Sequence, residues 1–255
     1  MTTQKSTKIN YLLSKHLPGT ICIAPWLENQ GISKDLQKHY RKSGWLEKIG
    51  TGAFKRPNDP IDWQGGLYTL QFQAELPIHV GAITALTMHG VTHYIRTTQE
   101  KIYLFSPPQT LLPLWFKKFD WANPIQHVRT SLLPEKIGLI SHELKTFEIK
   151  ISTPERAIIE CLYLTPNELD LVECYQLFEG MTNLRPKYLQ DTLQQCNSIK
   201  VKRLFLYMAN KARHQWLKHL DTGKINLGKG KRSLVKKGIY NAEFQITLPE
   251  ELVKL

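Results

Sequence analysis

The sequence predicts an α+β protein: an N-terminal winged helix-turn-helix domain, residues 1–60, and a larger mixed α/β domain, residues 61–255, with a further division near residue 150. Residues 6–56 show three helical patterns and then a hairpin pattern, in that order. The stretch Pro57-Asn-Asp-Pro60 is typical of a linker. Strand-like and helix-like segments alternate beyond it, and 255 residues are enough for two domains that each bury a core.

Three helices are predicted to open the first domain. Apolar residues recur at helical spacing over 6–17, and a Pro-Gly pair ends this segment. Pro25 is placed to begin a second helix over 26–30, which Gly31 ends. Ser33 is a natural N-cap for a third helix that runs to about residue 43, with Leu36 and Tyr40 on its inner side. A short helix, a glycine-containing turn and a second helix form the helix-turn-helix pattern.

The third helix is predicted to carry a basic face that binds DNA. Its cations recur on the side opposite Leu36 and Tyr40. They are Lys34, Lys38, Arg41 and Lys42. An α-helix fits the major groove of B-DNA, and residues at the start of a recognition helix lie nearest the base edges. We therefore expect Ser33 and Lys34 to reach bases and the other cations to contact DNA around them.

A β-hairpin wing is predicted after the third helix. The alternation over 45–49, the turn Gly50-Thr-Gly52 and the segment 53–56 predict its two strands. Lys48, Lys55 and Arg56 are expected to reach phosphate, which supplies affinity more than sequence discrimination. Two alternatives stay open: a small helical subdomain with a solvated basic face, and a winged helix that contacts protein.

Helices and strands are predicted to be mixed along the second domain. Thr153 as N-cap, Pro154 in the first turn and Glu155 near the helix dipole predict a helix over 153–163. Other helices are predicted at 63–74, 81–88, 169–178, 186–196 and 200–220. Strands are predicted at 101–106, 126–132 and 147–152, with a closing strand pair at 225–232 and 240–248.

The net charge of +12 is concentrated in two blocks. Residues 1–60 hold ten Lys/Arg against four Asp/Glu, and residues 197–240 hold twelve against one. Such blocks attract polyanions or an acidic partner protein. If the long C-terminal helix packs beside the closing strands, the second block forms a continuous positive surface, which favours a DNA backbone over a protein. Its candidate contact residues are Lys202, Arg203, Arg213, Lys218, Lys229, Lys231, Arg232, Lys236 and Lys237.

The cysteines and the N-terminus predict a cytoplasmic protein. Cys22, Cys161, Cys174 and Cys196 lie far apart in apolar or helical segments without a CxxC pair, so we expect them reduced and mostly buried. The polar N-terminus does not resemble a signal peptide, and no apolar run approaches the length of a membrane span.

No enzyme, metal site or cofactor is predicted. The segment Gly228-Lys-Gly-Lys-Arg232 lacks the P-loop spacing and is interpreted as a flexible basic loop. Glu168 and Asp170 are explained as a helix-start pair, and no nucleophile has a credible base. His79, His89 and His93 do not suggest a metal site, because Gly90 breaks the helix between the last two and no carboxylate completes the set.

With these pieces in order, the chain resembles the AbiEi family of antitoxins, in the branch with an N-terminal winged helix. Residues 36–57 look like the recognition helix and wing. The segment His79-Val-Gly-Ala-Ile-Thr-Ala-Leu-Thr-Met-His-Gly90, with His93-Tyr94, looks like the typical central segment of the family, and Thr153-Pro-Glu-Arg-Ala157 resembles the helix that opens its antitoxin domain. The wing departs from the pattern, because Ala53-Phe-Lys55 stands in place of a Gly-Val-Tyr type ending.

The resemblance implies an antitoxin of a two-gene toxin-antitoxin or phage-defence module. Such a protein represses its own promoter through inverted repeats in double-stranded DNA and counteracts a nucleotidyltransferase-like toxin, with or without direct contact. The basic surface of the C-terminal block then has two candidate partners, the DNA backbone or an acidic face of the toxin. Two other functions stay open: a ligand-responsive winged-helix regulator, and a nucleic-acid-processing enzyme that docks through its winged helix.

Overall fold

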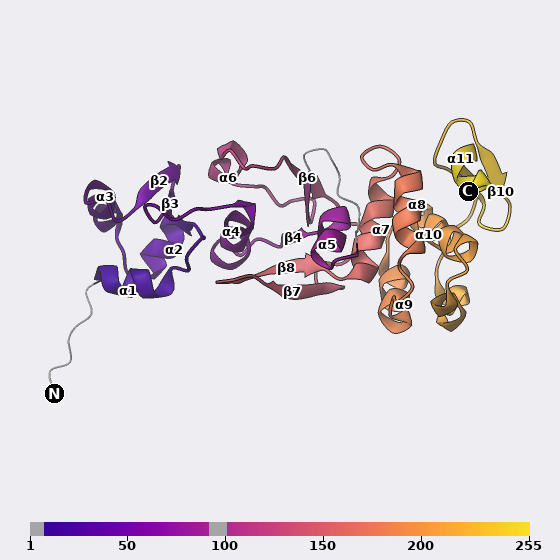
Figure 1. Ribbon diagram of the computed structural model, residues 1–255, viewed down its shortest axis with the longest axis horizontal. Helices are drawn as coiled ribbons and strands as arrows, with labels where there is room; N and C mark the ends of the chain where they lie inside the picture. Colours follow the sequence, from indigo (N-terminus) through magenta and orange to yellow (C-terminus); the bar gives the residue numbers. More distant parts are fainter. Residues whose placement is uncertain (1–7, 92–100) are drawn as a thin grey trace.

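The computed structural model describes residues 8–91 and 101–255, so the predicted family positions His93 and Tyr94 lie outside the described residues. The molecule is elongated, with the winged helix at one end, a five-stranded sheet in the middle, and helices with a small sheet at the other end (Figure 1). Among the described residues, none of the helices is both long and apolar enough to cross a membrane.

The predicted winged helix is present. Three helices, α1 (Lys8–Lys15), α2 (Ala24–Asn29) and α3 (Lys34–Lys42), accompany a sheet in the order β1-β3-β2. Its strands are β1 (Cys22–Ile23), β2 (Glu47–Gly50) and β3 (Ala53–Lys55). Leu12, Leu27, Ile32 and Tyr40 are buried with Phe54 in a small core of their own, because the apolar residues of each element face the same side.

A helix with two geometries links the winged helix to the main sheet. It begins as α4 (Trp63–Tyr68), whose N-cap Asp62 accepts a hydrogen bond from the Gly65 amide, and continues as the π-helix η1 (Thr69–Gln73). The helix predicted over 63–74 is therefore confirmed, but the change to π geometry was not predicted. π-helical segments are rare and occur frequently at functional sites.

The central sheet is mixed, in the order β6-β5-β4-β8-β7. Its strands are β4 (His79–Val80), β5 (Ile102–Ser106), β6 (Ile125–Arg129), β7 (Leu139–Glu143) and β8 (Glu148–Ser152). The β5–β6 and β4–β8 pairs are parallel, and the β4–β5 and β7–β8 pairs are antiparallel. The sequence patterns predicted β5, β6 and β8 but not β4 and β7, since β4 has two residues and three of the five residues of β7 are exposed with none buried.

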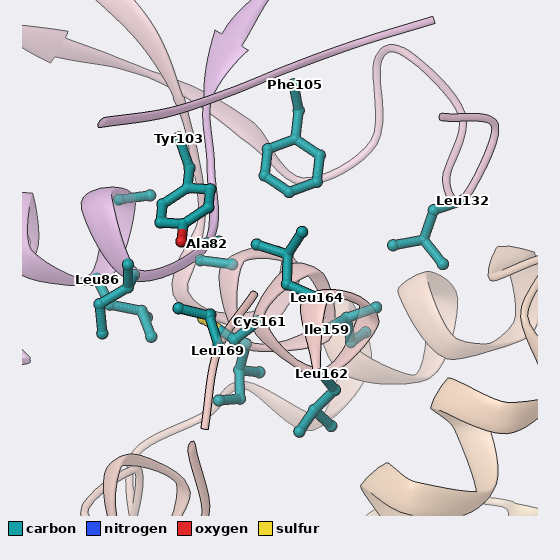
Figure 2. Packing of buried hydrophobic residues seen from close by; sticks show 14 of the residues in the cluster. Ala82, Leu86, Tyr103, Phe105, Leu132, Ile159, Cys161, Leu162, Leu164 and Leu169 are labelled. Carbon is teal, nitrogen blue, oxygen red and sulfur yellow. The ribbon is translucent and has the colours of Figure 1, made fainter. Parts of the chain in front are cut away.

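Helices α5 (Ala82–Met88) and α7 (Pro154–Leu164) pack against each other and against the sheet. Figure 2 shows Leu86 of α5, Tyr103 and Phe105 of β5, and Ile159 and Leu162 of α7 gathered in this core. The short helix α6 (Leu114–Lys118) packs against β2 of the winged helix. Thr153 caps α7 as predicted.

Buried polar groups hold the centre of this domain together. The Glu160 carboxylate accepts hydrogen bonds from the Ser152 hydroxyl (2.8 Å), the Ala82 amide (3.0 Å) and Arg156 Nε (2.7 Å), and it lies 3.0 Å from His79 Nε2. The Arg156 charge, together with the contact to His79, lowers the pKa of Glu160 to about 2 despite its burial. His79 is thus a partner of Glu160, and His89 Nε2 lies 2.8 Å from the Ser152 carbonyl oxygen.

The C-terminal part begins with the helices α8 (Leu171–Glu179), α9 (Pro186–Gln195) and α10 (Ile199–Lys211). Asp170 caps α8, as the helix-start interpretation predicted. The single helix predicted over 200–220 is wrong beyond Lys211, because Arg213 adopts a left-handed φ of 54° and the chain continues as the 3-10 helix η2 (Gln215–His219).

A three-stranded sheet closes the chain in place of the predicted strand pair. After the short 3-10 helix η3 (Thr222–Lys224), its order is β10-β11-β9, with β9 (Arg232–Ser233), β10 (Ile239–Asn241) and β11 (Ile246–Leu248). Helix α11 (Glu250–Lys254) follows. Most of the predicted strand 225–232 is a loop, which Arg203 holds as described below.

Candidate nucleic-acid interface

Helix α3 presents the predicted basic face to solvent. Lys34, Lys38, Arg41 and Lys42 are all exposed, and within the described residues none of the four makes an ion pair or a side-chain hydrogen bond. On the inner side, Tyr40 is 6% exposed and Gln37 donates to the Ile32 carbonyl at 3.0 Å. The basic face is therefore free because the opposite face fixes the helix on the small core.

Ser33 combines the predicted capping role with exposure. Its hydroxyl accepts a hydrogen bond from the Leu36 amide at 3.4 Å, and the residue remains exposed beside Lys34. A capping hydroxyl keeps its own proton to donate, so Ser33 can meet an acceptor beyond the helix start. His39 on α3 and Trp45 just after the helix are also exposed, although neither was predicted as a contact. His39 could have been predicted, because it is a polar residue of α3 next in sequence to Lys38. Nothing in the sequence pattern distinguishes Trp45 from a core residue.

Of the three predicted phosphate contacts on the wing, only Lys48 is both exposed and free of an ion pair among the described residues. Lys48 is exposed on β2. Lys55, which is opposite Glu47 in the hairpin, lies 3.4 Å from the Glu47 carboxylate and donates to the Asp59 carbonyl at 3.3 Å. Lys55 is thus half-buried and already paired, because the register of the hairpin places a carboxylate across from it.

Arg56 is a structural residue, which corrects its prediction as a phosphate contact. Its guanidinium donates to the carbonyl oxygens of Leu13 and His16, and its Nε donates to His16 Nδ1 at 3.2 Å. His16 Nε2 lies 3.0 Å from the Thr20 carbonyl, so it donates there while Nδ1 accepts. Burial and the nearby Arg56 charge lower the pKa of His16 to about 4, so the ring is neutral at physiological pH.

The C-terminal block divides into buried and exposed cations. Arg203 is 2% exposed, and it donates to the carbonyl oxygens of Leu227 (2.9 Å), Gly230 (2.6 Å), Gln245 (3.0 Å) and Gly228 (3.2 Å). Lys202 is 3% exposed. Neither can serve as a surface contact, so their predicted contact role is wrong. The sequence did not show that Arg203 faces the segment that leads into the closing sheet.

Arg203 gives the glycine-rich loop a fixed shape, which corrects the interpretation of a flexible loop. The guanidinium holds three carbonyls of the segment 227–230, and Gly228 and Gly230 adopt the positive φ values, 61° and 77°, that this path requires. Of the cations within and after this loop, the lysines are exposed and Arg232 is half-buried. We call Lys229, Lys231, Arg232, Lys236 and Lys237 the C-terminal basic surface.

The C-terminal basic surface contains no acidic residue between positions 222 and 242. Tyr240 is 40% exposed, and its ring centroid lies 4.9 Å from Lys231 Nζ. Arg213 and Lys218 are exposed near the end of α10, and Lys218 donates to Gln215 at 2.9 Å. The surface lies at the opposite end of the molecule from α3 (Figure 1), so one duplex that meets both must run along the long axis or bend toward it.

One polar pair in the middle of the molecule was missed. Ser106 Oγ, at the end of β5, lies 2.8 Å from His127 Nε2 on the neighbouring strand β6. Burial, aided by Arg129 and Lys117, lowers the pKa of His127 to about 4. No local pattern pairs residues that lie 21 positions apart. The carboxylate that would orient the imidazole in a catalytic triad is not found beside it among the described residues, and the pair joins two strands.

Two family models together match nearly the whole chain. A family model described as "Transcriptional regulator, AbiEi antitoxin N-terminal domain" matches residues 5–97, and one described as "Transcriptional regulator, AbiEi antitoxin, Type IV TA system" matches residues 99–249. No curated protein matches the sequence. The fold resembles that of the RV2827C protein from Mycobacterium tuberculosis, with a TM-score of 0.57 and 12% identity, over 93% of this chain and 88% of that chain. The chain therefore belongs to the AbiEi antitoxin family, the transcriptional regulators of type IV toxin-antitoxin systems.

Proposed function

We propose that this protein binds inverted repeats in its own promoter DNA through α3 and represses the operon. The observation that carries this proposal is the unpaired cationic face of α3 on a rigid winged helix, in a chain that belongs to a family of transcriptional regulators. Ser33 and Lys34 meet base edges in the major groove, while Lys38, Arg41 and Lys42 bind the flanking phosphates. On the wing, Lys48 supplies the phosphate contact and Lys55 contributes less, because it is paired with Glu47.

The test of this assignment is a salt titration of promoter binding. Fluorescence anisotropy with the protein's own promoter duplex should show weaker binding of the Lys38→Ala, Arg41→Ala variant and a salt slope reduced by about two units, one for each lost phosphate contact. The matched control is Lys145→Ala, Lys187→Ala, which removes two exposed lysines outside both basic surfaces. Unchanged affinity of the α3 variant at moderate salt would exclude α3 as the recognition helix.

We also propose that the protein counteracts a nucleotidyltransferase-like toxin encoded beside it. The support is membership of the antitoxin family together with the larger α/β part that follows the winged helix. An adjacent nucleotidyltransferase-like reading frame is required. Co-expression should restore growth to cells that produce this toxin, and the Lys38→Ala, Arg41→Ala variant should rescue growth as well as the unmodified protein while it fails to repress the promoter. Loss of both activities in this folded variant would contradict the separation.

The C-terminal basic surface is proposed as an auxiliary contact to the DNA backbone. Its support is the absence of acidic residues over 222–242 and the rigid loop held by Arg203. Charge reversal at Lys229, Lys231 and Arg232 should lower promoter affinity most strongly at low salt and leave toxin rescue intact. If repression survives and rescue is lost, the surface belongs to the toxin interface instead.

A further inference from the structure

A cavity of about 840 Å³ lies where the two halves of the chain meet. Its walls come from η1 and the segment leading into β4, from the chain after β5 and β6, and from β7 and β8. Thus the lining includes residues matched by both family models, 5–97 and 99–249. The volume lies within the range of about 300–1,000 Å³ that is usual for small-molecule sites.

The cavity exists because β4 is short. Its two residues pair with β5 at His79–Phe105 and with β8 at Val80–Ile151, whereas both neighbours have five residues. The rest of the gap between β5 and β8 is left without a strand. The Gln71 side chain bridges part of it, since its Oε1 accepts from the Lys150 amide at 2.8 Å and its Nε2 donates to the Ile78 carbonyl at 2.8 Å.

Most of the hydrogen-bonding capacity of the buried ionic groups in the lining is used within the protein; among the described residues, only Arg156 Nη2 is left without a hydrogen bond. Glu160 is bonded to four groups, as described above, and Arg156 Nη1 donates to the Pro134 and Ile137 carbonyls (2.9 and 2.5 Å). A ligand gains little from groups whose hydrogen-bonding capacity is used within the protein. The charges of a ligand are therefore met by the other charged residues of the lining, together with Arg156 Nη2 for a carboxylate.

These other residues carry both signs of charge and are unpaired. Glu75, Glu135, Lys136 and Lys150 line the cavity, and all four are exposed. None of them has an ion pair or a side-chain hydrogen bond within 8–91 and 101–255. The remaining lining combines apolar and neutral polar side chains. The apolar ones include Leu76, Ile78, Phe105, Leu132 and Leu139 with several prolines, and the neutral polar ones are Gln71, Ser106, Gln109, Thr130, Ser131, Ser141 and Asn197.

This lining selects one class of ligand. The two exposed carboxylates balance the two exposed lysines, so the lining lacks the excess positive charge that a polyanion such as a nucleotide requires. Phe105 and His79 are the aromatic rings of the lining and stack on each other, which leaves little for a base or sugar. The described residues hold no cluster of three metal-ligating side chains. Opposite charges around an apolar interior fit a molecule with an ammonium group, a carboxylate group and apolar side chains. We propose that the cavity binds a short zwitterionic peptide with apolar side chains, and that its occupancy alters promoter binding.

The first link from the cavity to the winged helix is η1. On one side of this π-helix, Gln71 contacts the cavity strands. From the same five residues, the Thr69 hydroxyl donates to the Ile21 carbonyl (2.8 Å) and accepts from the Ile21 amide (3.2 Å), and the Gln73 amide group bonds to Ile21 and Ile23 of the winged helix. A shift of Gln71 on ligand binding therefore moves the groups that hold β1.

The second link is the segment after β5. Ser106, Pro107, Pro108 and Gln109 form a wall of the cavity, and the same segment leads directly into α6. Trp115 of α6 packs so closely on Gly50 of the wing that a Cβ added there would lie 2.6 Å from the Trp115 Cβ. Because tightly packed contacts have low compressibility, a movement of α6 would displace the wing at Gly50.

The experiment uses the full chain, the tripeptide Leu-Leu-Leu and its N-acetylated, C-amidated form, which represents an internal segment of a protein. Isothermal titration calorimetry measures peptide binding, and anisotropy measures promoter affinity with and without saturating peptide. Two double variants, called the rim variants, each remove one sign of charge from the exposed residues of the lining. The first is Glu75→Gln with Glu135→Gln, and the second is Lys136→Met with Lys150→Met. The matched control is Glu143→Gln, Lys145→Met, which changes exposed charges outside the cavity.

We expect the free tripeptide to bind with at least tenfold higher affinity than the blocked form. Each rim variant should bind the free tripeptide at least tenfold more weakly than the unmodified protein, and the affinity of the control should change by less than twofold. Saturation should change promoter affinity by about fivefold or more, as in typical allosteric coupling. Equal binding of the blocked peptide, unaffected rim variants, absence of millimolar binding, or an unchanged promoter affinity would each overturn the proposal. The DNA readout rests on the proposed function: if the protein alone does not bind its promoter, that function fails, while the calorimetry still decides whether the site exists.

Discussion

Arg56, the last residue of the predicted wing, donates a hydrogen bond from Nε to His16 Nδ1 at 3.2 Å. Its guanidinium also donates to the carbonyl oxygens of Leu13 and His16. Since α1 ends at Lys15, these carbonyls belong to its C-terminal turn, where a cation also complements the helix dipole. One arginine thus joins the end of the hairpin to the first helix.

Replacing Arg56 with methionine should therefore destabilise the winged helix by about 3 kcal/mol, because charged hydrogen bonds to three acceptors are lost. Urea unfolding measures this loss. Below the unfolding transition, the salt slope of promoter binding should equal that of the unmodified protein. Lys48→Ala provides the contrast, with unchanged stability and a slope lower by about one unit. A reduced slope in Arg56→Met would restore Arg56 as a phosphate contact.

The stability of the winged helix should fall as the pH is lowered from 6.5 to 4. The pKa of His16 is about 4 in the folded protein against 6.5 when unfolded, so the unfolded chain binds more protons in this window and acid favours unfolding. Across the full window the contribution is about 3 kcal/mol. His16→Gln removes the titrating group, so its stability should change less steeply with pH, even though it starts lower. Parallel pH curves for the two proteins would contradict this account.

Loss of Arg203 should release the loop 227–230. Arg203→Met leaves four carbonyls without their donor, and we expect a cost of about 3 kcal/mol together with faster trypsin cleavage after Lys229 and Lys231. Arg213→Met serves as the control, because Arg213 is exposed. Cleavage at an unchanged rate in Arg203→Met would show that the loop holds its shape by other means.

Gly65 and Gly180 should respond in opposite ways to alanine. A Cβ at Gly65 would lie 1.8 Å from the Gly19 carbonyl oxygen, so α4 must move off the turn after α1, at a cost of about 3 kcal/mol. Gly180 has a helical φ of −69° and its nearest neighbour lies at 3.4 Å, so alanine there should be neutral or stabilise by up to about 1 kcal/mol. Thermal unfolding of both variants measures the contrast.

Local signals in the sequence predicted the elements that have strong periodicity or caps. Ser33 and Thr153 cap the helices that were predicted to begin after them, and Asp170, explained as part of a helix-start pair, caps the helix predicted over 169–178. The basic face of α3 followed from helical spacing alone. The four cysteines are buried, as expected. These features depend on residues within one or two turns of each other, which is why one sequence was enough.

The errors concern partners that are distant in the sequence. Nothing near Arg56 or Arg203 distinguishes them from solvated cations, since their acceptors lie about 40 and 24 to 42 positions away. Strand β4 has two residues and owes its position to β5 and β8, so it shows no period of its own. The cavity escaped prediction for the same reason, because its walls come together only through the order of the sheet.

The bonds from Thr69 and Gln73 to Ile21 and Ile23 also limit how relatives of this protein can be recombined. A chimaera joined in the Pro57–Pro60 segment would place a foreign β1 against these two side chains, and the new pair would meet without having been selected together. A junction after Ala74 would transfer the winged helix together with Thr69 and Gln73, the two residues that bond to Ile21 and Ile23, as one exchangeable unit. Operator specificity could then be transplanted between family members with the contacts to β1 intact.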